Sequence, residues 1–294
     1  MTTPPDVSPL LRGAYDIHVH CAPDVIPRAQ DLDELAAEAS MAGMAGVLLK
    51  DHTASTVGRA HALNCLYRRG PRFLSALVLN PPVGALNPFA VEAALRQGAD
   101  VIYMPTYAAQ HQIDVLGPEG FAPAYPRPEG FEGITVLDEA KEIDSEVLEI
   151  LDLIAEHDAV LATGHVATEE VFALLKAAQL YGIRRVIVTH ASHAVPAMSV
   201  ADQMQATTFG AFIEHCLMPT MHSGPGAISV EEIRDQVRAV GPEHVILSSD
   251  LGQVDNGPVV PGFARCLGRL TDAGLTEDEI RVMIVNNPAK LFFG

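Results

Sequence analysis

Two histidines separated by one residue, His18 and His20, lie in the stretch DIHVHCAPD (residues 16–24). In an extended strand, alternate side chains point to the same face, so both imidazoles can be directed at one ion. Imidazole nitrogens bind zinc and related metals at about 2.0–2.1 Å. The spacing therefore predicts part of a metal site, and further ligands must come from elsewhere in the chain.

Suitable ligands recur at the ends of later apolar stretches. His165 ends AVLATGH, His190 ends RRVIVTH, and Asp250 ends HVILSSD. Together with His18 and His20, they offer nitrogen and oxygen donors, which suit zinc, manganese or iron better than calcium or magnesium. We therefore expect one or two divalent transition metal ions, with zinc as the preferred metal.

These residues would be positioned by a repeated strand–helix pattern. Short apolar runs rich in β-formers alternate with helical patterns, which is typical of βαβ units around a parallel sheet. Helix signals are also present, such as the capping box of Ser229 and Glu232. The pattern predicts a single α/β domain over residues 1–294, folded as a (β/α)8 TIM barrel. The expected strands are residues 15–20, 45–52, 72–79, 99–106, 159–166, 184–191, 210–217 and 244–251.

In such barrels the chemistry lies at the C-terminal ends of the strands, where the βα loops converge. The candidate ligands fall at those ends. Lys50 and His52 similarly end the second predicted strand. His193, Glu214 and His222 lie near the ends of the sixth and seventh, where each could face the site or serve only in a turn or a buried pair.

The connection between the fourth and fifth predicted strands is longer than the others. Residues 107–144 are rich in proline and glycine and contain several aromatic side chains. A connection of this length in a compact domain is usually functional or disordered. We interpret it as a loop insertion that acts as an active-site lid.

Composition excludes several classes of protein. The net charge of −18, without clustered lysines and arginines, argues against a nucleic-acid partner. The four cysteines lack a C-x-x-C spacing and indicate no disulfide framework, which fits a reducing cytoplasm. No long apolar run or basic-apolar leader pattern is present, so neither a membrane partner nor export is expected. We expect a small-molecule substrate, and a homo-oligomer is compatible with the sequence.

The order of these motifs resembles the metal-dependent hydrolases of the amidohydrolase superfamily, over essentially the whole chain. The stretches LATGH (161–165), VILSSDLGQ (245–253) and NNPAKLFFG (286–294) are similar to an amidohydrolase-like bacterial branch of unknown function. The resemblance implies a TIM barrel with a hydrolytic metal site. Its implied metal ligands are His18, His20, His165 and Asp250, with His190 holding either a second metal or the attacking water.

One departure from the superfamily concerns the bridging ligand. Many two-metal members have a lysine or glutamate at the end of strand four, whereas ADVIYMPT (residues 99–106) contains neither. Lys50 could supply the bridge as a carbamate, or could remain an ammonium that binds an anionic substrate or an oxyanion. A structural salt bridge is the alternative. The predicted catalytic residues are Asp250, Lys50, His52 and His190.

The predicted reaction is hydrolysis of a C–N bond in an amide or cyclic amide by a metal-activated water, with lactones as the next substrate class. Asp250 would take the proton from the water and pass it to the leaving group. Two alternatives remain open at this point. One is a metal-dependent decarboxylase of the same superfamily, and the other is a non-catalytic barrel with a structural metal.

Overall fold

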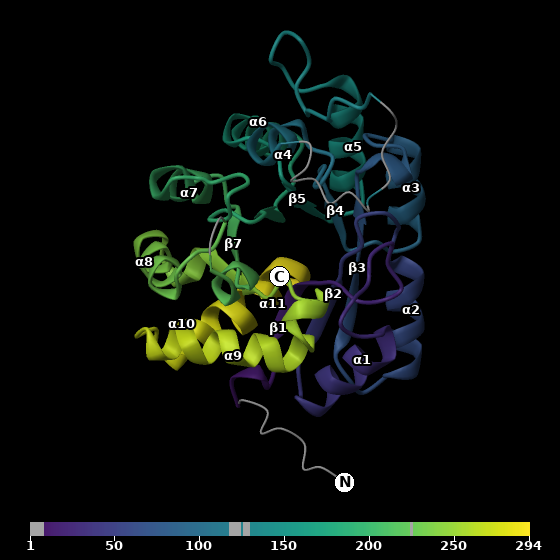
Figure 1. The fold of residues 1–294 in the computed structure, drawn as a ribbon. Coiled ribbons are helices and arrows are strands. Elements are labelled where there is room, and N and C mark those ends of the chain that lie inside the picture. The colour runs from purple at the N-terminus through teal and green to yellow at the C-terminus, as the bar shows by residue number, and fades with distance from the viewer. Residues whose placement is uncertain (1–8, 118–124, 126–129, 224–225) are drawn as a thin grey trace. The chain divides into compact units, whose positions relative to one another are not determined.

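The computed structural model describes residues 9–117, 125, 130–223 and 226–294. Eight strands form one parallel sheet in the order β1 to β8. Helices separate the strands along the chain, and Figure 1 labels most of these elements. This is the predicted (β/α)8 barrel, and each predicted strand contains one observed strand. The strands are β1 (Tyr15–Val19), β2 (Gly46–Leu49), β3 (Arg72–Val78), β4 (Val101–Tyr103), β5 (Val160–Ala162), β6 (Val186–Val188), β7 (Phe212–Cys216) and β8 (Val245–Ser248).

Helices follow the strands, and local capping explains where several of them begin. The α8 helix starts at the predicted capping box, in which Ser229 Oγ accepts the amide of Glu232 and the Glu232 carboxylate accepts the amide of Ser229. The helices are α1 (Leu32–Met41), α2 (Val57–Leu66), α3 (Pro88–Arg96), α4 (Gln110–Leu116), α5 (Ser145–Glu156), α6 (Thr168–Leu180), α7 (Val200–Thr207), α8 (Val230–Val240), α9 (Val259–Asp272), α10 (Glu277–Arg281) and α11 (Asn287–Phe293).

The chain divides into two compact units, with boundaries inside β3 and β7. Unit 1 contains the described parts of Met1–Leu49, Gly58–Leu74 and Cys216–Gly294. Unit 2 contains Lys50–Val57 and the described parts of Ser75–His215. The single domain expected from the sequence stays a prediction.

In unit 1, β1 lies between β2 and β8. Asp16 and Val19 of β1 lie opposite Val47 and Leu49 of β2 in parallel register. On the other side, the chain after β8 continues the pairing, because the Asp250 amide donates to the His18 carbonyl at 2.9 Å. The first and last strands are therefore neighbours, as the closure of a barrel requires.

Unit 2 contains the parallel run from β3 to β7. Ala76 lies opposite Val101, and Val101 opposite Val160, so consecutive strands are adjacent in the sheet. Helix α5 packs on this unit through its buried apolar face, which includes Ile150 and Ile154. This alternation of buried strand and amphipathic helix is the feature that the sequence pattern predicted.

The connection over residues 107–144 contains secondary structure that the sequence analysis did not predict. It begins with helix α4, and residues after it are attached to helix α6 because Glu170 accepts hydrogen bonds from Thr135 Oγ1 (2.6 Å) and from the amide of Val136 (2.9 Å). The predicted lid also includes residues 118–124 and 126–129, which lie outside the described residues. Its function as a lid stays a prediction.

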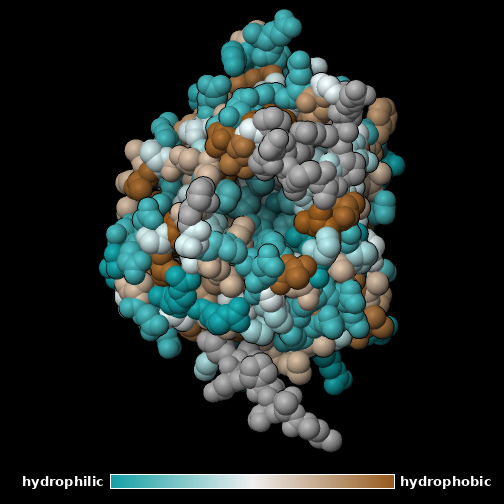
Figure 2. All heavy atoms as spheres, in the orientation of Figure 1, coloured by the Kyte–Doolittle hydropathy of each residue, from teal (hydrophilic) through white to brown (hydrophobic). Residues whose placement is uncertain are grey.

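The face drawn in Figure 2 is mixed in hydropathy. Hydrophilic side chains are spread over it, and hydrophobic ones form separate patches between them. Among the described residues, no helix combines the length and the apolar character needed to cross a bilayer.

Candidate metal centre

Three predicted ligands meet at the end of β1 in unit 1. Asp250 Oδ1 lies 3.4 Å from His18 Nε2 and 3.2 Å from His20 Nε2. The three side chains are buried, and their donor atoms all lie within 4.8 Å of one another. Alternation along β1 therefore brings the two imidazoles to one carboxylate, as the spacing predicted.

The spacing of these donors fits a transition metal. Ligands held at about 2.1 Å around a tetrahedral ion are about 3.4 Å from one another, and around an octahedral ion about 3.0 Å. The two histidine–aspartate distances of 3.4 and 3.2 Å lie in this range. Two imidazoles and one carboxylate also match the donor set of open catalytic zinc sites, which leave a coordination position for water.

The backbone after β8 has uncommon conformations where it brings Asp250 close to His18 and His20. Asp250 has a φ of 54°, a left-handed conformation that is uncommon for a residue with a side chain. Gly252 has a φ of 131°, and a Cβ there would collide with the carbonyl oxygen of His20 and lie 2.6 Å from its carbonyl carbon. The site therefore requires glycine at position 252, where the chain passes directly against His20.

The buried carboxylate of Asp16, which sequence reasoning missed, holds the chain just before Asp250 in place. Asp16 Oδ1 accepts the amide of Ser249 at 2.9 Å, which connects β1 to the chain just before Asp250. Burial raises the pKa of Asp16 to about 7, against the lowering effect of its hydrogen bonds from Ser249. The signal available in the sequence was the position of Asp16, two residues before His18 and on the same face by alternation.

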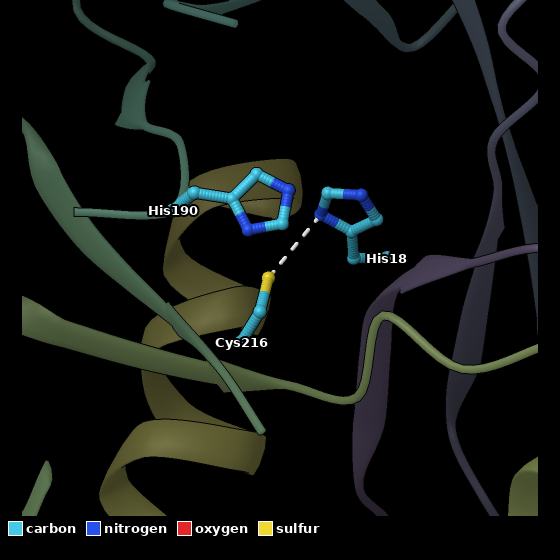
Figure 3. A group of neighbouring side chains, drawn as sticks. All are labelled: His18, His190 and Cys216. Atoms are coloured by element: carbon cyan, nitrogen blue, oxygen red, sulfur yellow. Dashed lines mark hydrogen bonds between the residues drawn. The ribbon is translucent and has the colours of Figure 1, made fainter. Parts of the chain in front are cut away.

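Cys216 is a second contact that sequence reasoning missed. Its Sγ lies 3.5 Å from His18 Nδ1, and Figure 3 shows the two side chains pointing toward each other. Cys216 ends β7, so the rule that strand ends line the site could have identified it. The spacing of the cysteines could not reveal this contact, because a single cysteine makes it.

In unit 2, His52 is held by a buried polar group. His52 Nδ1 lies 2.9 Å from Thr106 Oγ1. Asn80 Nδ2 donates to Thr106 Oγ1 at 2.7 Å and to the His52 carbonyl at 3.0 Å. The rings of Tyr107 and Tyr125 lie 6.0 and 5.2 Å from the His52 ring, so this imidazole is fixed on several sides.

The other predicted histidines of unit 2 form a row of neighbouring rings. Ring centroids are 6.5 Å apart for His52 and His165, 4.9 Å for His165 and His190, and 5.4 Å for His190 and His193. His165 Nδ1 donates to Gln112 Oε1 of α4, which leaves Nε2 as the nitrogen with a lone pair when the ring is neutral. His190 has a φ of 55°, the same uncommon conformation as Asp250.

Lys50 is buried in unit 2, with its Nζ 4.8 Å from the centre of the Tyr103 ring. This geometry is that of a cation–π contact, which suits an ammonium. The carbamate and the anion-binding alternatives for Lys50 stay predictions.

The sequence left the roles of Glu214 and His222 undecided. Glu214 is fully buried, whereas His222 is exposed.

His215, next to Glu214 on β7, is also fully buried. Its Nδ1 lies 2.9 Å from Ser192 Oγ. Burial lowers the pKa of His215 to about 4, although the negative charge of Glu214 raises it. This pKa makes His215 neutral at physiological pH.

The structure thus brings together two groups of predicted residues. Unit 1 unites His18, His20 and Asp250, and unit 2 unites His52, His165, His190 and His193. Contacts that the sequence did not reveal accompany both groups, from Cys216 in unit 1 and from Gln112 in unit 2.

Comparison with solved structures gives the same fold. The chain is similar to an amidohydrolase from Pseudomonas aeruginosa (12% identity, TM-score 0.63, covering 97% of this chain and 96% of that one). It is also similar to a lactonase from Listeria monocytogenes (12%, 0.60, 97% and 95%) and to a triple mutant of an organophosphorus hydrolase from Deinococcus radiodurans (14%, 0.60, 97% and 95%). The resemblance to the amidohydrolase superfamily is therefore confirmed at the level of the fold.

Comparison by sequence gives the family. No curated protein matches the chain. A family described as "Family of unknown function (DUF6282)" matches residues 13–214, which is more than half of the chain and includes His18, His20, His165 and His190. The chain belongs to this family of unknown function.

Proposed function

We propose that this protein is a metal-dependent hydrolase whose metal is held by His18, His20 and Asp250. The observation that carries the proposal is the convergence of their three donor atoms at spacings that suit a transition metal. The left-handed backbone at Asp250 supports the proposal, because uncommon backbone conformations of this kind cluster at functional sites.

The proposed ligand set also includes His165 and His190, as the sequence predicts. Support for this comes from within unit 2, where the two rings are neighbours at 4.9 Å and Gln112 orients His165. An imidazole whose other nitrogen is held by an oxygen acceptor is the usual form of a histidine ligand. One or two divalent ions would be bound, and zinc is the preferred metal for this donor set.

The chemistry follows from the properties of these groups. A divalent metal held by these residues would lower the pKa of a water molecule and polarise the scissile bond of a substrate. Asp250 is placed to accept a proton from the attacking water and return it to the leaving group, since its Oδ1 faces both histidines at the site. Its left-handed backbone conformation holds the carboxylate in that position.

His52 and Lys50 are proposed to act on the substrate. The contact with Thr106 and the flanking tyrosines hold His52 in one orientation, which is the condition for a group that donates or accepts a hydrogen bond during a reaction. Lys50 would either bind an anionic part of the substrate or bridge two metals as a carbamate.

The proposed substrate is a small molecule with an amide or cyclic amide bond, and lactones are the next class. The similar structures named above include an amidohydrolase and a lactonase, which act on different bonds. They support hydrolysis as the class of reaction. The bond itself is proposed from the role of Asp250, because an amine leaving group needs the proton that this carboxylate can return.

The test is a screen of metal-loaded protein against amides, cyclic amides and lactones in water labelled with oxygen-18. Hydrolysis predicts one labelled oxygen in the product and no turnover after the metal has been removed. Release of carbon dioxide, with no label incorporated into the organic product, would show a decarboxylase instead. Turnover that does not depend on the metal would contradict the proposal.

A further inference from the structure

The two ring nitrogens of His18 face two different groups. Nε2 lies 3.4 Å from Asp250 Oδ1, and Nδ1 lies 3.5 Å from Cys216 Sγ (Figure 3). The sulfur also lies 3.3 Å from Ser248 Oγ. His18, Cys216 and Ser248 are all buried. The imidazole is therefore held between the carboxylate of the candidate metal centre and a thiol.

We propose that Cys216 is a positioning residue of the metal centre, which accepts the Nδ1–H of His18 and so presents Nε2 as the metal-binding nitrogen. This inference rests on the proposed function only in that a metal binds at His18, His20 and Asp250. The proposal gives β7 a role in the metal centre, because Cys216 ends that strand. The predicted ligands in unit 1 come from β1 and from the end of β8.

The physical reason is the tautomerism of the imidazole. A neutral ring carries one proton, and the nitrogen that carries it cannot bind a metal. A partner that accepts a hydrogen bond from one nitrogen therefore selects the other nitrogen as the ligand and fixes the plane of the ring. Carboxylates and carbonyls usually take this position, whereas here it is taken by a thiol sulfur.

Ser248 completes the arrangement. A thiol can accept at sulfur and donate its own S–H, so Cys216 can accept from His18 and donate to Ser248 Oγ at 3.3 Å. The three side chains then form a chain of hydrogen bonds from β1 through β7 to β8. Because all three are buried, the loss of the sulfur would remove an acceptor for His18 that solvent does not readily replace.

Direct coordination by Cys216 is the competing interpretation. Its sulfur faces Nδ1, whereas Asp250 faces Nε2 on the opposite side of the ring. One ion bound at Nε2 beside Asp250 would thus not be expected to reach the sulfur. A metal with a sulfur ligand would give a Zn–S distance of about 2.3 Å, which X-ray absorption can detect.

The test is the metal affinity of the full-length protein and of its cysteine variants, measured with zinc and cobalt by chelator competition. We expect Cys216→Ala to lose about 10- to 100-fold in affinity, the range seen when such orienting partners are removed. Cys216→Ser, whose oxygen can still accept from Nδ1, should keep most of the affinity. Cys266→Ala is the matched control, since Cys266 is another buried cysteine of unit 1 that lies on α9.

The cobalt spectrum separates positioning from coordination. Wild-type protein should lack the intense near-ultraviolet absorption of a sulfur–cobalt bond, and X-ray absorption should show no metal–sulfur distance. A sulfur–metal signal that disappears in Cys216→Ser would overturn the inference in favour of direct coordination. Unchanged affinity in both Cys216 variants would also overturn it. If Cys216→Ala does not fold, Cys216→Val takes its place, because valine fills a similar space without an acceptor and should show the same loss of affinity. Wild-type protein that binds no metal would contradict the proposed function as well, whereas the other failures affect only Cys216.

Discussion

The amide of Asp250 donates a hydrogen bond to the carbonyl of His18 at 2.9 Å, while the Asp250 carboxylate lies 3.4 Å from the imidazole of the same histidine. Main chain and side chain of one residue therefore both contact His18. The left-handed φ of 54° at Asp250 accompanies this double contact. Its cost is of the order of 1–3 kcal/mol, and residues that keep such conformations cluster at functional sites.

The first prediction concerns the carboxylate. Asp250→Asn keeps the shape of the side chain but removes the basic oxygen that takes a proton. We expect a loss of about 10²–10⁴-fold in kcat on a substrate found in the screen, with little change in KM. The measurement is kcat at saturating substrate, with metal content determined in the same sample and the fold checked by circular dichroism. A metal-loaded variant that keeps more than about a tenth of the wild-type kcat would show that Asp250 is not the proton carrier.

The second prediction concerns the close passage of the chain at Gly252. Gly252→Ala would place a Cβ against the backbone of His20 in a conformation that alanine rarely adopts. We expect the free energy of unfolding to fall by about 2 kcal/mol or more, and the metal affinity to fall with it. Urea unfolding and chelator competition measure the two effects.

The control for this substitution is Gly182→Ala. Gly182 follows helix α6 with a positive φ of 73°, and a Cβ there would meet nothing within 4 Å. This substitution should lose only about 1–2 kcal/mol, the cost of a left-handed alanine, and keep its metal affinity. Equal effects of the two substitutions would mean that the approach to His20 does not matter.

The third prediction is a pH dependence of stability from His215. Its pKa is about 4 in the folded protein, below the ordinary value of 6.5, because it is buried. Below pH 6.5 the unfolded chain therefore binds a proton that the folded protein does not, and stability falls as the pH falls toward 4. Between pH 7 and pH 5, the protonation of this histidine in the unfolded chain should lower the free energy of unfolding by about 2 kcal/mol.

His215→Asn tests this dependence, because its amide nitrogen can replace Nδ1 in the contact with Ser192. The wild type should lose about 2 kcal/mol more than the variant between pH 7 and pH 5 in urea unfolding. Groups that titrate in both proteins cancel in this difference. Parallel pH profiles would show that His215 is not the source.

The fold was largely predictable because each strand is a short apolar run followed by a helical pattern. The segment 15–20 predicted β1 at Tyr15–Val19, for example, and the alternation of His18 and His20 placed both on one face. The convergence of Asp250 on them followed from the rule that strand ends in a barrel line one site. These inferences needed only local periodicity and the order of the elements.

The rest of the site depends on contacts between distant residues that periodicity does not reveal. Cys216 and His18 are 198 residues apart in the sequence. The sequence does not indicate that the two residues are in contact, or which ring nitrogen of His18 faces the sulfur. Gln112 lies in a segment whose prolines and glycines obscure helix α4. Asp16 is an ordinary strand residue in sequence, and only its buried contact with Ser249 shows its importance.

The central claim is the metal centre at the end of β1, and the metal content of purified protein tests it most directly. The measurement is elemental analysis of the wild type, of the His18→Ala/His20→Ala double variant and of a His61→Ala control, whose histidine is exposed on α2. We predict about one or two equivalents of a transition metal per chain in the wild type and the control. The folded double variant should contain none. A folded double variant with full metal content would contradict the account.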